Sequence, residues 1–185
     1  MKDIMLDIET LDTAQSAVVL SIGAVVFDPH SKELGEKFYV EFTDDLATQQ
    51  RVGRTVSAAT VVWWMQQGAA AKQIFADPAP EGVRRVSTAQ GLTEFASFIS
   101  RNGGEEAKLW GNGSDFDNVI VGSLFDSFGL AKPWSSSRNR CYRTMKRMFG
   151  EGVKVSRYGV HHNGLDDAIT QAVHLQEIMA CIKQQ

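Results

Sequence analysis

The stretch "MLDIET", residues 5–10, places two acids inside an apolar run close to the start of the chain. Apolar residues flank Asp7, and Glu9 follows two positions later. Successive side chains of a β-strand point to opposite faces, so Asp7 and Glu9 lie on the same face of such a strand. Two carboxylates side by side in apolar surroundings repel each other and lose hydration unless a positive group lies between them. The stretch therefore predicts a buried strand whose paired acids hold a cation.

Length and composition indicate one soluble globular domain that covers residues 1–185. The chain has 43% hydrophobic and 22% charged residues, which is enough apolar material for a core without disulfides. Its net charge of −3 argues against a strongly basic nucleic-acid coat protein, although a local basic patch can still bind nucleic acid. Cys141 and Cys181 lack metal-ligand spacing, so we expect reduced thiols. With no leader and no apolar run of about 18 residues, we expect a cytoplasmic protein without a membrane partner.

The pattern of apolar residues predicts three strands before the first helix. The third strand alternates cleanly, and the turn-rich stretch before it indicates an antiparallel hairpin. The expected strands are 3–9, 16–28, 36–43 and, later in the chain, 107–113. The expected helices are 57–75 and 87–102, capped by Ser57 and Ser87, then 115–129, the basic segment 138–150 and the amphipathic segment 165–185. We therefore expect one mixed α/β domain that opens with an antiparallel β-meander.

Acids recur in three clusters that are far apart in the sequence. The clusters are "LDIET" (6–10), "WGNGSDFDN" (110–118) and "HHNGLDDA" (161–168). Acids in a first helical turn complement the helix dipole, so the Asp pairs of the last two clusters have an ordinary structural explanation. The strand pair Asp7 and Glu9 has none. A divalent cation bound by all three clusters explains them together, because Mg²⁺ and Mn²⁺ prefer carboxylate oxygens.

The chemistry that such a site predicts is phosphoryl transfer. Two divalent ions about 3.5–4 Å apart can clamp the attacking and leaving oxygens of this reaction. Four carboxylates can hold two ions and still leave positions for substrate and water. A neutral histidine can then deprotonate the attacking water, and either His161 or His162, just before the last acid pair, can provide it.

The order and spacing of three motifs resemble the DnaQ-like exonucleases of the DEDDh type. The motifs are Asp7-x-Glu9, Phe116-Asp117, and His162 followed five residues later by Asp167. The last motif of that family reads H-x-A-x-x-D-A, a register that selects His162 over His161 and Asp167 over Asp166. The middle motif, residues 112–117, is one residue longer than the usual N-x-x-F-D and looks like the phage and prophage (DexA-like) branch.

The resemblance implies an RNase H-like fold, in which helices flank a mixed five-stranded sheet. It also implies a 3′-5′ exonuclease that uses two Mg²⁺ or Mn²⁺ ions and releases nucleoside 5′-monophosphates. The implied metal ligands are Asp7, Glu9, Asp117 and Asp167, with His162 as general base. The implied substrate contacts are Ile8 and Thr10, beside Glu9, and Asn112 and Phe116 of the middle motif. The roles of Asp115 and Asp166 stay open.

A concentrated basic stretch and a tryptophan pair are further candidates for substrate contact. Seven Lys or Arg residues stand against one acid between positions 138 and 157. A solvated helix face is one explanation, and contact with nucleic-acid phosphates is the other; for the latter we select Arg140 and Arg143. Trp63 and Trp64 are adjacent, so both cannot face the core of one helix, and we assign base stacking to Trp64.

The expected partner is the 3′ end of a single-stranded nucleic acid. Resemblance to the phage branch favours DNA over RNA, and an exoribonuclease of the same fold is the alternative, since no residue can be assigned to reading the 2′-hydroxyl. The resemblance also leaves open a homodimer, although one chain carries all five catalytic groups.

Two readings from other functional classes compete with the exonuclease. A haloacid-dehalogenase-type phosphatase also opens with an apolar strand that ends in acids, but its second acid is Asp, and His162 would have no role. A non-catalytic RNase H-like module would bind nucleic acid without metal. The complete set of four acids and a histidine argues against that loss of catalysis.

Overall fold

Strand β1 (Asp3–Thr10) lies at the centre of a five-stranded sheet in the computed structural model, which describes residues 3–183. The other strands are β2 (Val19–Phe27), β3 (Leu34–Glu41), β4 (Lys108–Gly111) and β5 (Arg140–Cys141), in the order β3-β2-β1-β4-β5. The pairs β1–β2 and β2–β3 are antiparallel, whereas β4 runs parallel to both β1 and β5. The predicted opening meander and the mixed five-stranded sheet are therefore confirmed.

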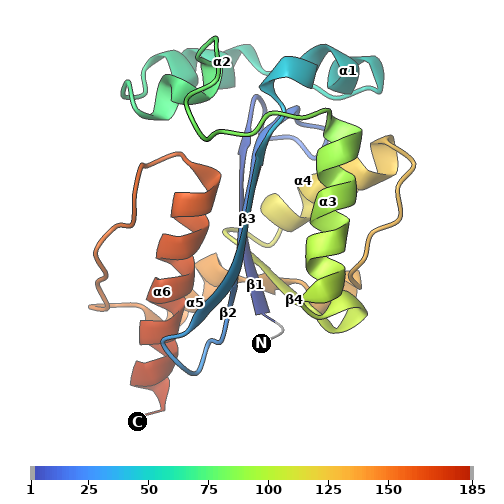
Figure 1. Cartoon of the computed structure of the whole chain (residues 1–185). Helices are drawn as coiled ribbons and strands as arrows, with labels where there is room; N and C mark the ends of the chain where they lie inside the picture. The colour runs from blue at the N-terminus through green and yellow to red at the C-terminus, as the bar shows by residue number, and fades with distance from the viewer. Residues whose placement is uncertain (1–2, 184–185) are drawn as a thin grey trace.

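Helices cover both faces of this sheet. They are α1 (Leu46–Arg51), α2 (Ala58–Met65), α3 (Thr88–Arg101), α4 (Asp117–Ser127), α5 (Tyr142–Phe149) and α6 (Gly164–Ile182). Figure 1 shows α3 and α4 on one face, α6 and α5 on the other, and α1 and α2 across one end. The hydroxyls of Ser57 and Ser87 accept N–H groups of α2 and α3, as the sequence predicts. Among residues 3–183, no helix combines the length and apolar character needed to cross a bilayer.

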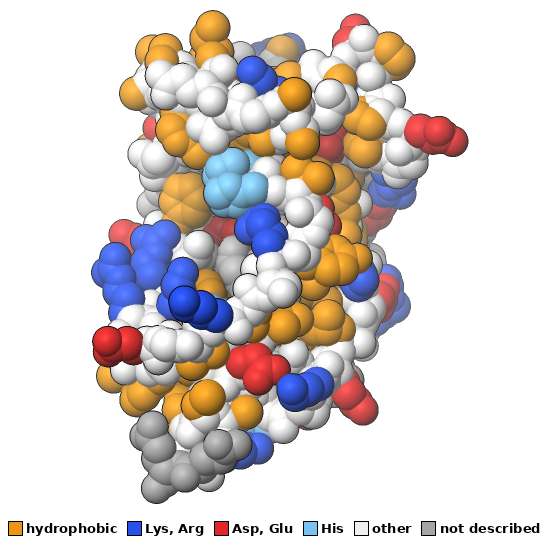
Figure 2. Space-filling model, turned by 90° about the vertical axis from the view of Figure 1, so that its left-hand side faces the viewer, with side chains coloured by type: hydrophobic (Ala, Val, Ile, Leu, Met, Phe, Trp, Pro, Cys, Tyr) orange, Lys and Arg blue, Asp and Glu red, His pale blue; other side chains and the backbone are white. Residues whose placement is uncertain are grey.

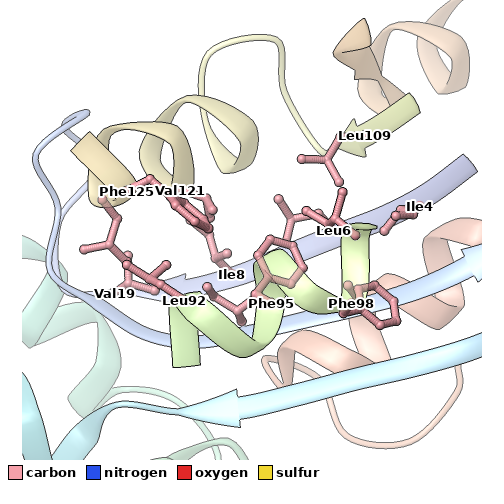
Figure 3. Close-up of a cluster of buried hydrophobic side chains, with 14 of the residues drawn as sticks. Ile4, Leu6, Ile8, Val19, Leu92, Phe95, Phe98, Leu109, Val121 and Phe125 are labelled. Atoms are coloured by element: carbon pink, nitrogen blue, oxygen red, sulfur yellow. The ribbon is translucent and has the colours of Figure 1, made fainter. Parts of the chain in front are cut away.

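The alternation of side chains along β1 separates the main core from the acids. Ile4, Leu6 and Ile8 point towards α3 and α4, where they pack with large aromatic residues such as Phe95 (Figure 3). Met5, two residues before Asp7, points to the opposite face and packs in a second core beneath α6. Because the side-chain period of a strand is two, Asp7 and Glu9 share the α6 side of the sheet.

The expected helix 57–75 is wrong in its second half. Helix α2 ends at Met65, and a separate 3₁₀ segment, η2 (Ala71–Phe75), follows. The ring centroids of Trp64 and Phe75 are 5.3 Å apart. A continuous helix would separate these residues by about 16 Å along its axis, so the chain must fold back between them. Gly68 favours the break, because glycine is a poor helix former.

Two other elements also differ from the sequence-based expectation. The basic helix begins at Tyr142 rather than 138, because Arg140 and Cys141 pair with β4 as a short strand. Helix α1 is not among the elements expected from the sequence. Helix α6 follows the expected segment 165–185 closely, and the last two residues of that segment lie outside the described part of the chain. Cys141 and Cys181 are free thiols.

Two glycines allow the first turn of α6 to touch the sheet directly. Gly23 of β2 pairs with Asp7 of β1. A Cβ atom on Gly23 would lie 2.1 Å from the carbonyl carbon of Gly164 and from the amide nitrogen of Leu165, a distance that real Cβ atoms do not show. Contact between the two backbones therefore sets the height of α6 above the sheet, and with it the position of Asp167.

We predict that Gly23→Ala is destabilising, because the new methyl group must push α6 away from β2. Overpacking of this kind costs about 1–3 kcal/mol. Unfolding in urea followed by circular dichroism measures the change. Gly68→Ala is the matched control, since a Cβ atom there meets nothing within 4 Å. Equal stability of the two variants would contradict the proposed backbone contact.

Candidate active site

A cavity of about 760 Å³ opens above the carboxyl end of β1. Its walls come from β1, α2, the start of α5 and the segment that leads into α6. The lining includes five of the predicted substrate-contact residues: Ile8, Thr10, Asn112, Phe116 and Arg143. On this side of the molecule, Figure 2 shows histidine and several Lys or Arg side chains around a hollow in which carboxylate groups are visible. The segments that the sequence separates by more than 100 residues thus meet at one place.

Three of the four predicted metal ligands form a tight group in this cavity. Each of Asp7, Glu9 and Asp167 offers a carboxylate oxygen, and these oxygens lie within 4.8 Å of one another. Asp7 and Glu9 come from the same face of β1, and Asp167 comes from the first turn of α6. Glu9 and Asp167 are 7% and 9% exposed, so solvent screens their repulsion poorly. We call these three residues the acid trio.

The fourth predicted ligand, Asp117, lies beside the acid trio rather than within it. It begins α4, is buried, and does not line the cavity. Its carboxylate accepts the backbone N–H groups of Ile8 at 3.3 Å and of Asn112 at 2.6 Å. These two bonds tie the middle motif to β1. By contrast, Asp115 is exposed, so burial also distinguishes the two acids of this motif.

Asp166, the neighbour of Asp167, has a different partner. Its carboxylate accepts the Val160 N–H at 2.7 Å and so holds the segment that leads into α6. It is not one of the grouped acids. Of these two neighbours, only Asp167 has its carboxylate in the group.

Burial and mutual repulsion raise the pKa values of the acids. Burial, followed by the charges of Asp117 and Glu9, raises the pKa of Asp7 well above its usual value. Burial and the charge of Asp117 raise the pKa of Glu9 to about 8. For Asp117, burial outweighs its backbone hydrogen bonds and raises its pKa to about 6. Burial first, and like charge second, therefore disfavour the ionised forms of these acids.

The donor set fits a divalent cation. Carboxylate oxygens are the preferred ligands of Mg²⁺ and Mn²⁺. The acid trio supplies three such oxygens within 4.8 Å of one another. Gln171 donates its Nε2 hydrogen to Asp7 at 2.6 Å, which orients that carboxylate. The amide oxygen of Gln171 is buried and has no hydrogen-bond partner. A bound cation would relieve the carboxylate repulsion directly.

His162 has an unusual backbone conformation next to the acid trio. Its φ angle is 64°, a left-handed value that is uncommon outside glycine. Its backbone N–H donates to Asp167 Oδ2 at 3.0 Å, so this backbone conformation is tied to the position of the candidate metal ligand. The rings of His161 and His162 stack with centroids 3.8 Å apart. Burial, followed by the charges of His161 and Arg157, lowers the pKa of His162, so its imidazole is neutral at neutral pH and can accept a proton.

The two adjacent tryptophans lie in opposite environments, and the one selected from the sequence is the buried one. Trp64, predicted to stack on bases, is 3% exposed and donates its indole N–H to the Thr10 carbonyl at 2.8 Å. Trp63 is 40% exposed, lines the cavity, and lies 4.8 Å from the His162 ring. Adjacency in the sequence indicates that the two differ, but the partner that buries one of them comes from the distant strand β1. Trp63 is therefore the tryptophan whose ring is exposed to the cavity.

Only one of the two selected arginines reaches the cavity. Arg143 lines it, together with Lys146 one turn later on α5. Arg140 does not; it donates to the carbonyls of Ser137 and Asn139. A third basic residue, Arg157, lines the cavity and forms an ion pair with Asp167. The composition predicts a basic stretch here, whereas the residues that reach the cavity depend on how the loop after α5 folds.

Comparisons with known proteins identify the family to which this sequence is similar. The family described as "3'-5' exoribonuclease Rv2179c-like domain" matches residues 2–179. An exodeoxyribonuclease of Enterobacteria phage T4 is 27% identical over 136 residues, which cover 67% of this chain and 56% of the phage enzyme. The chain thus spans little more than half the length of that relative.

Two solved structures share the fold at low sequence identity. The nuclease domain of 3'hExo, a DEDDh family member bound to rAMP, has a TM-score of 0.59 and 12% identity, over 98% of this chain and 92% of that one. A 3'-exonuclease described with recognition of a histone mRNA stem-loop has a TM-score of 0.57 and 12% identity, over 98% and 81%. These likenesses confirm the RNase H-like arrangement of sheet and helices.

We predict that the metal-free protein loses stability as pH rises, and that Glu9→Gln removes much of this loss. The pKa of Glu9 is raised from 4.5 to about 8 in the folded state, so its contribution is fully present below pH 4.5 and lost as pH rises through 8. Within that window the loss is at most about 1.4 kcal/mol per pH unit. Thermal melts in EDTA from pH 5 to 9 measure it. A stability difference between wild type and variant that does not change with pH would contradict the assignment.

Proposed function

The chain belongs to the family of 3'-5' exoribonuclease Rv2179c-like domains, and from this premise we propose that it hydrolyses single-stranded nucleic acid stepwise from the 3′ end. The products of such a reaction are nucleoside 5′-monophosphates. The observation that supports the proposal most directly is the grouping of Asp7, Glu9 and Asp167 within 4.8 Å, with His162 beside them. Neither a phosphatase nor a binding module explains this grouping together with the family match.

We assign the four acids to two divalent cations, Mg²⁺ or Mn²⁺. The acid trio supports the first position, and Asp117, which contributes to the raised pKa values of Asp7 and Glu9, supports the second. Cations bound there would stabilise the charge that develops on the attacking and leaving oxygens of the phosphodiester. The protein contributes by fixing the carboxylates on β1, α4 and α6, so that little reorganisation is needed at the moment of reaction.

His162 is the proposed general base. Its lowered pKa leaves the imidazole neutral at neutral pH. The hydrogen bond from its backbone N–H to Asp167 positions the residue at the edge of the acid trio. From there the ring can take a proton from the attacking water. The edge-on contact with Trp63 limits how far the ring can turn.

The terminal nucleotide is proposed to lie along the end of β1. The backbone from Ile8 to Thr10 lines one side of the cavity, and the exposed face of Trp63 offers a surface for the base. Arg143 and Lys146 lie on the α5 side, where they can contact phosphates without reading the sequence. The cavity volume of about 760 Å³ falls within the range of about 300–1,000 Å³ that is typical of small-ligand sites.

The names of the relatives point to both kinds of nucleic acid. The family that matches residues 2–179 is described as an exoribonuclease, and the phage relative is described as an exodeoxyribonuclease. The family match covers more of the chain than the match to the phage relative does. It favours RNA as the substrate, whereas the sequence motifs alone favour DNA. We therefore propose that both are tested side by side.

We predict a metal-dependent ladder that shortens from the 3′ end when the protein meets a 5′-labelled single-stranded RNA or the matching DNA. EDTA should abolish the ladder, and so should Asp7→Asn, which removes one charge from the acid trio. His162→Ala keeps all four acids and should lower kcat by about 10²–10⁴-fold. Denaturing gels with Mg²⁺, Mn²⁺ or EDTA give the result, and the relative rates rank RNA against DNA. Cleavage that persists in EDTA or in Asp7→Asn would overturn the metal assignment.

We also predict that Trp63→Ala weakens binding of a single-stranded oligonucleotide to a Ca²⁺-loaded protein. Loss of one stacked base costs about 1–3 kcal/mol, which is about a 5- to 150-fold rise in Kd. Fluorescence anisotropy measures Kd. Val62→Ala is the control, because Val62 is exposed on the same helix but does not line the cavity. Equal affinity of the two variants would exclude base stacking on Trp63.

A further inference from the structure

The guanidinium group of Arg157 contacts the acid trio through Asp167. Its Nη2 atom donates to Asp167 Oδ1 and to the carbonyl of Val160, the latter at 3.1 Å. Among residues 3–183, no other Lys or Arg side chain forms an ion pair with the acid trio or with Asp117. Burial raises the pKa values of Asp7 and Glu9, and the charge of Arg157 offsets part of that rise, so its field reaches these two acids as well as Asp167. Without a metal, this one side chain is the main counter-charge of the acid trio.

The ion pair occupies an oxygen that a cation needs. Asp167 Oδ2 already accepts the His162 N–H at 3.0 Å, and Oδ1 is taken by Arg157. The His162 bond comes from the backbone and cannot leave without refolding the segment. The Arg157 side chain is 37% exposed and can move. A divalent cation that binds Asp167 therefore competes with Arg157 before it competes with any other group.

The backbone around Arg157 is held in place, which limits where the displaced group can go. The Tyr158 N–H donates to the hydroxyl of Thr170 at 3.1 Å, and the Val160 N–H donates to Asp166 at 2.7 Å. Between them, Gly159 has a φ of 55° and packs against Asp166 so closely that a Cβ atom would lie 2.1 Å from its carboxylate. Release from Asp167 is thus a side-chain movement, and the guanidinium stays at the cavity.

We propose that Arg157 is an exchangeable counter-ion: a divalent cation displaces it from Asp167, and the freed guanidinium then binds a phosphate group of the substrate. This inference rests on the proposed function. Guanidinium groups match phosphate oxygens through paired, charge-assisted hydrogen bonds, so phosphate is the ligand that the freed group selects. The cation competes with Arg157 for the Asp167 carboxylate, and the phosphate competes with Asp167 for the Arg157 guanidinium. Each ligand therefore tightens the binding of the other, since coupling between two sites is reciprocal.

Manganese binding to the metal-free protein tests this coupling without reference to catalysis. Electron paramagnetic resonance of free Mn²⁺ gives the Kd of the protein with and without AMP as the phosphate ligand. For the wild type, AMP should lower the Kd for Mn²⁺. Arg157→Gln should bind Mn²⁺ about fivefold or more tightly without AMP, because the competitor is gone, and AMP should then add little.

Lys146→Gln is the matched control, because it removes one positive charge from the same cavity. Its side chain lines the cavity but pairs with none of the site acids. Equal tightening in both variants would mean that general electrostatics explains the effect, and the exchange proposal would be overturned. Unchanged or weaker Mn²⁺ binding by Arg157→Gln would overturn it as well. If the wild type fails to bind Mn²⁺, the proposed metal site itself is wrong.

A second measurement uses the wild type, so it does not depend on the folding of a variant. The Nε–H signal of Arg157 in nitrogen-15 spectra, assigned by its absence in Arg157→Lys, reports the environment of the guanidinium. Saturation with Mg²⁺ should shift this signal, and AMP should shift it again. A signal that saturating Mg²⁺ leaves unmoved would overturn the exchange.

Discussion

Repulsion among buried carboxylates is the constraint on which this structure depends. Asp7, Glu9 and Asp167 lie within 4.8 Å of one another, and Asp117 is close enough to raise the pKa values of two of them. Such an arrangement costs free energy in a protein without its ligands, so the rest of the fold must be stable enough to hold it. A sheet whose central strand is packed by helices on both faces provides this support (Figure 1).

The central strand serves the core and the site at the same time because of its two-residue period. One face of β1 contributes Ile4, Leu6 and Ile8 to the aromatic core under α3 and α4. The other face carries Asp7 and Glu9 towards α6. A shift of one residue in the pairing of β1 would place the acids in the apolar core, so the hydrophobic face fixes the orientation of the site.

Much of this architecture could be predicted from the sequence, because the signals are local. Only a short window of residues is needed to see the apolar alternation near residue 7, the serine caps of α2 and α3, and the amphipathic pattern of α6. The acids Asp7, Glu9 and Asp167 were predicted by motif spacing and are found together. The break after Met65, the burial of Trp64 rather than Trp63, and the ion pair of Arg157 depend on contacts between distant segments. Gly68 is a local signal for the break, but no local pattern indicates which tryptophan is buried or which acid pairs with Arg157.

The backbone contact between Gly23 and Gly164 has a consequence for how such sequences can diverge. Side chains differ in size from one homologue to another, but all residues share the same main-chain atoms. Where main chain meets main chain, the separation of α6 from β1 does not depend on which side chains fill the rest of that interface. Substitutions beneath α6 can therefore change how stable the protein is while the spacing of Asp7 and Asp167 is preserved. Selection for stability and selection for catalysis can then act on separate sets of positions.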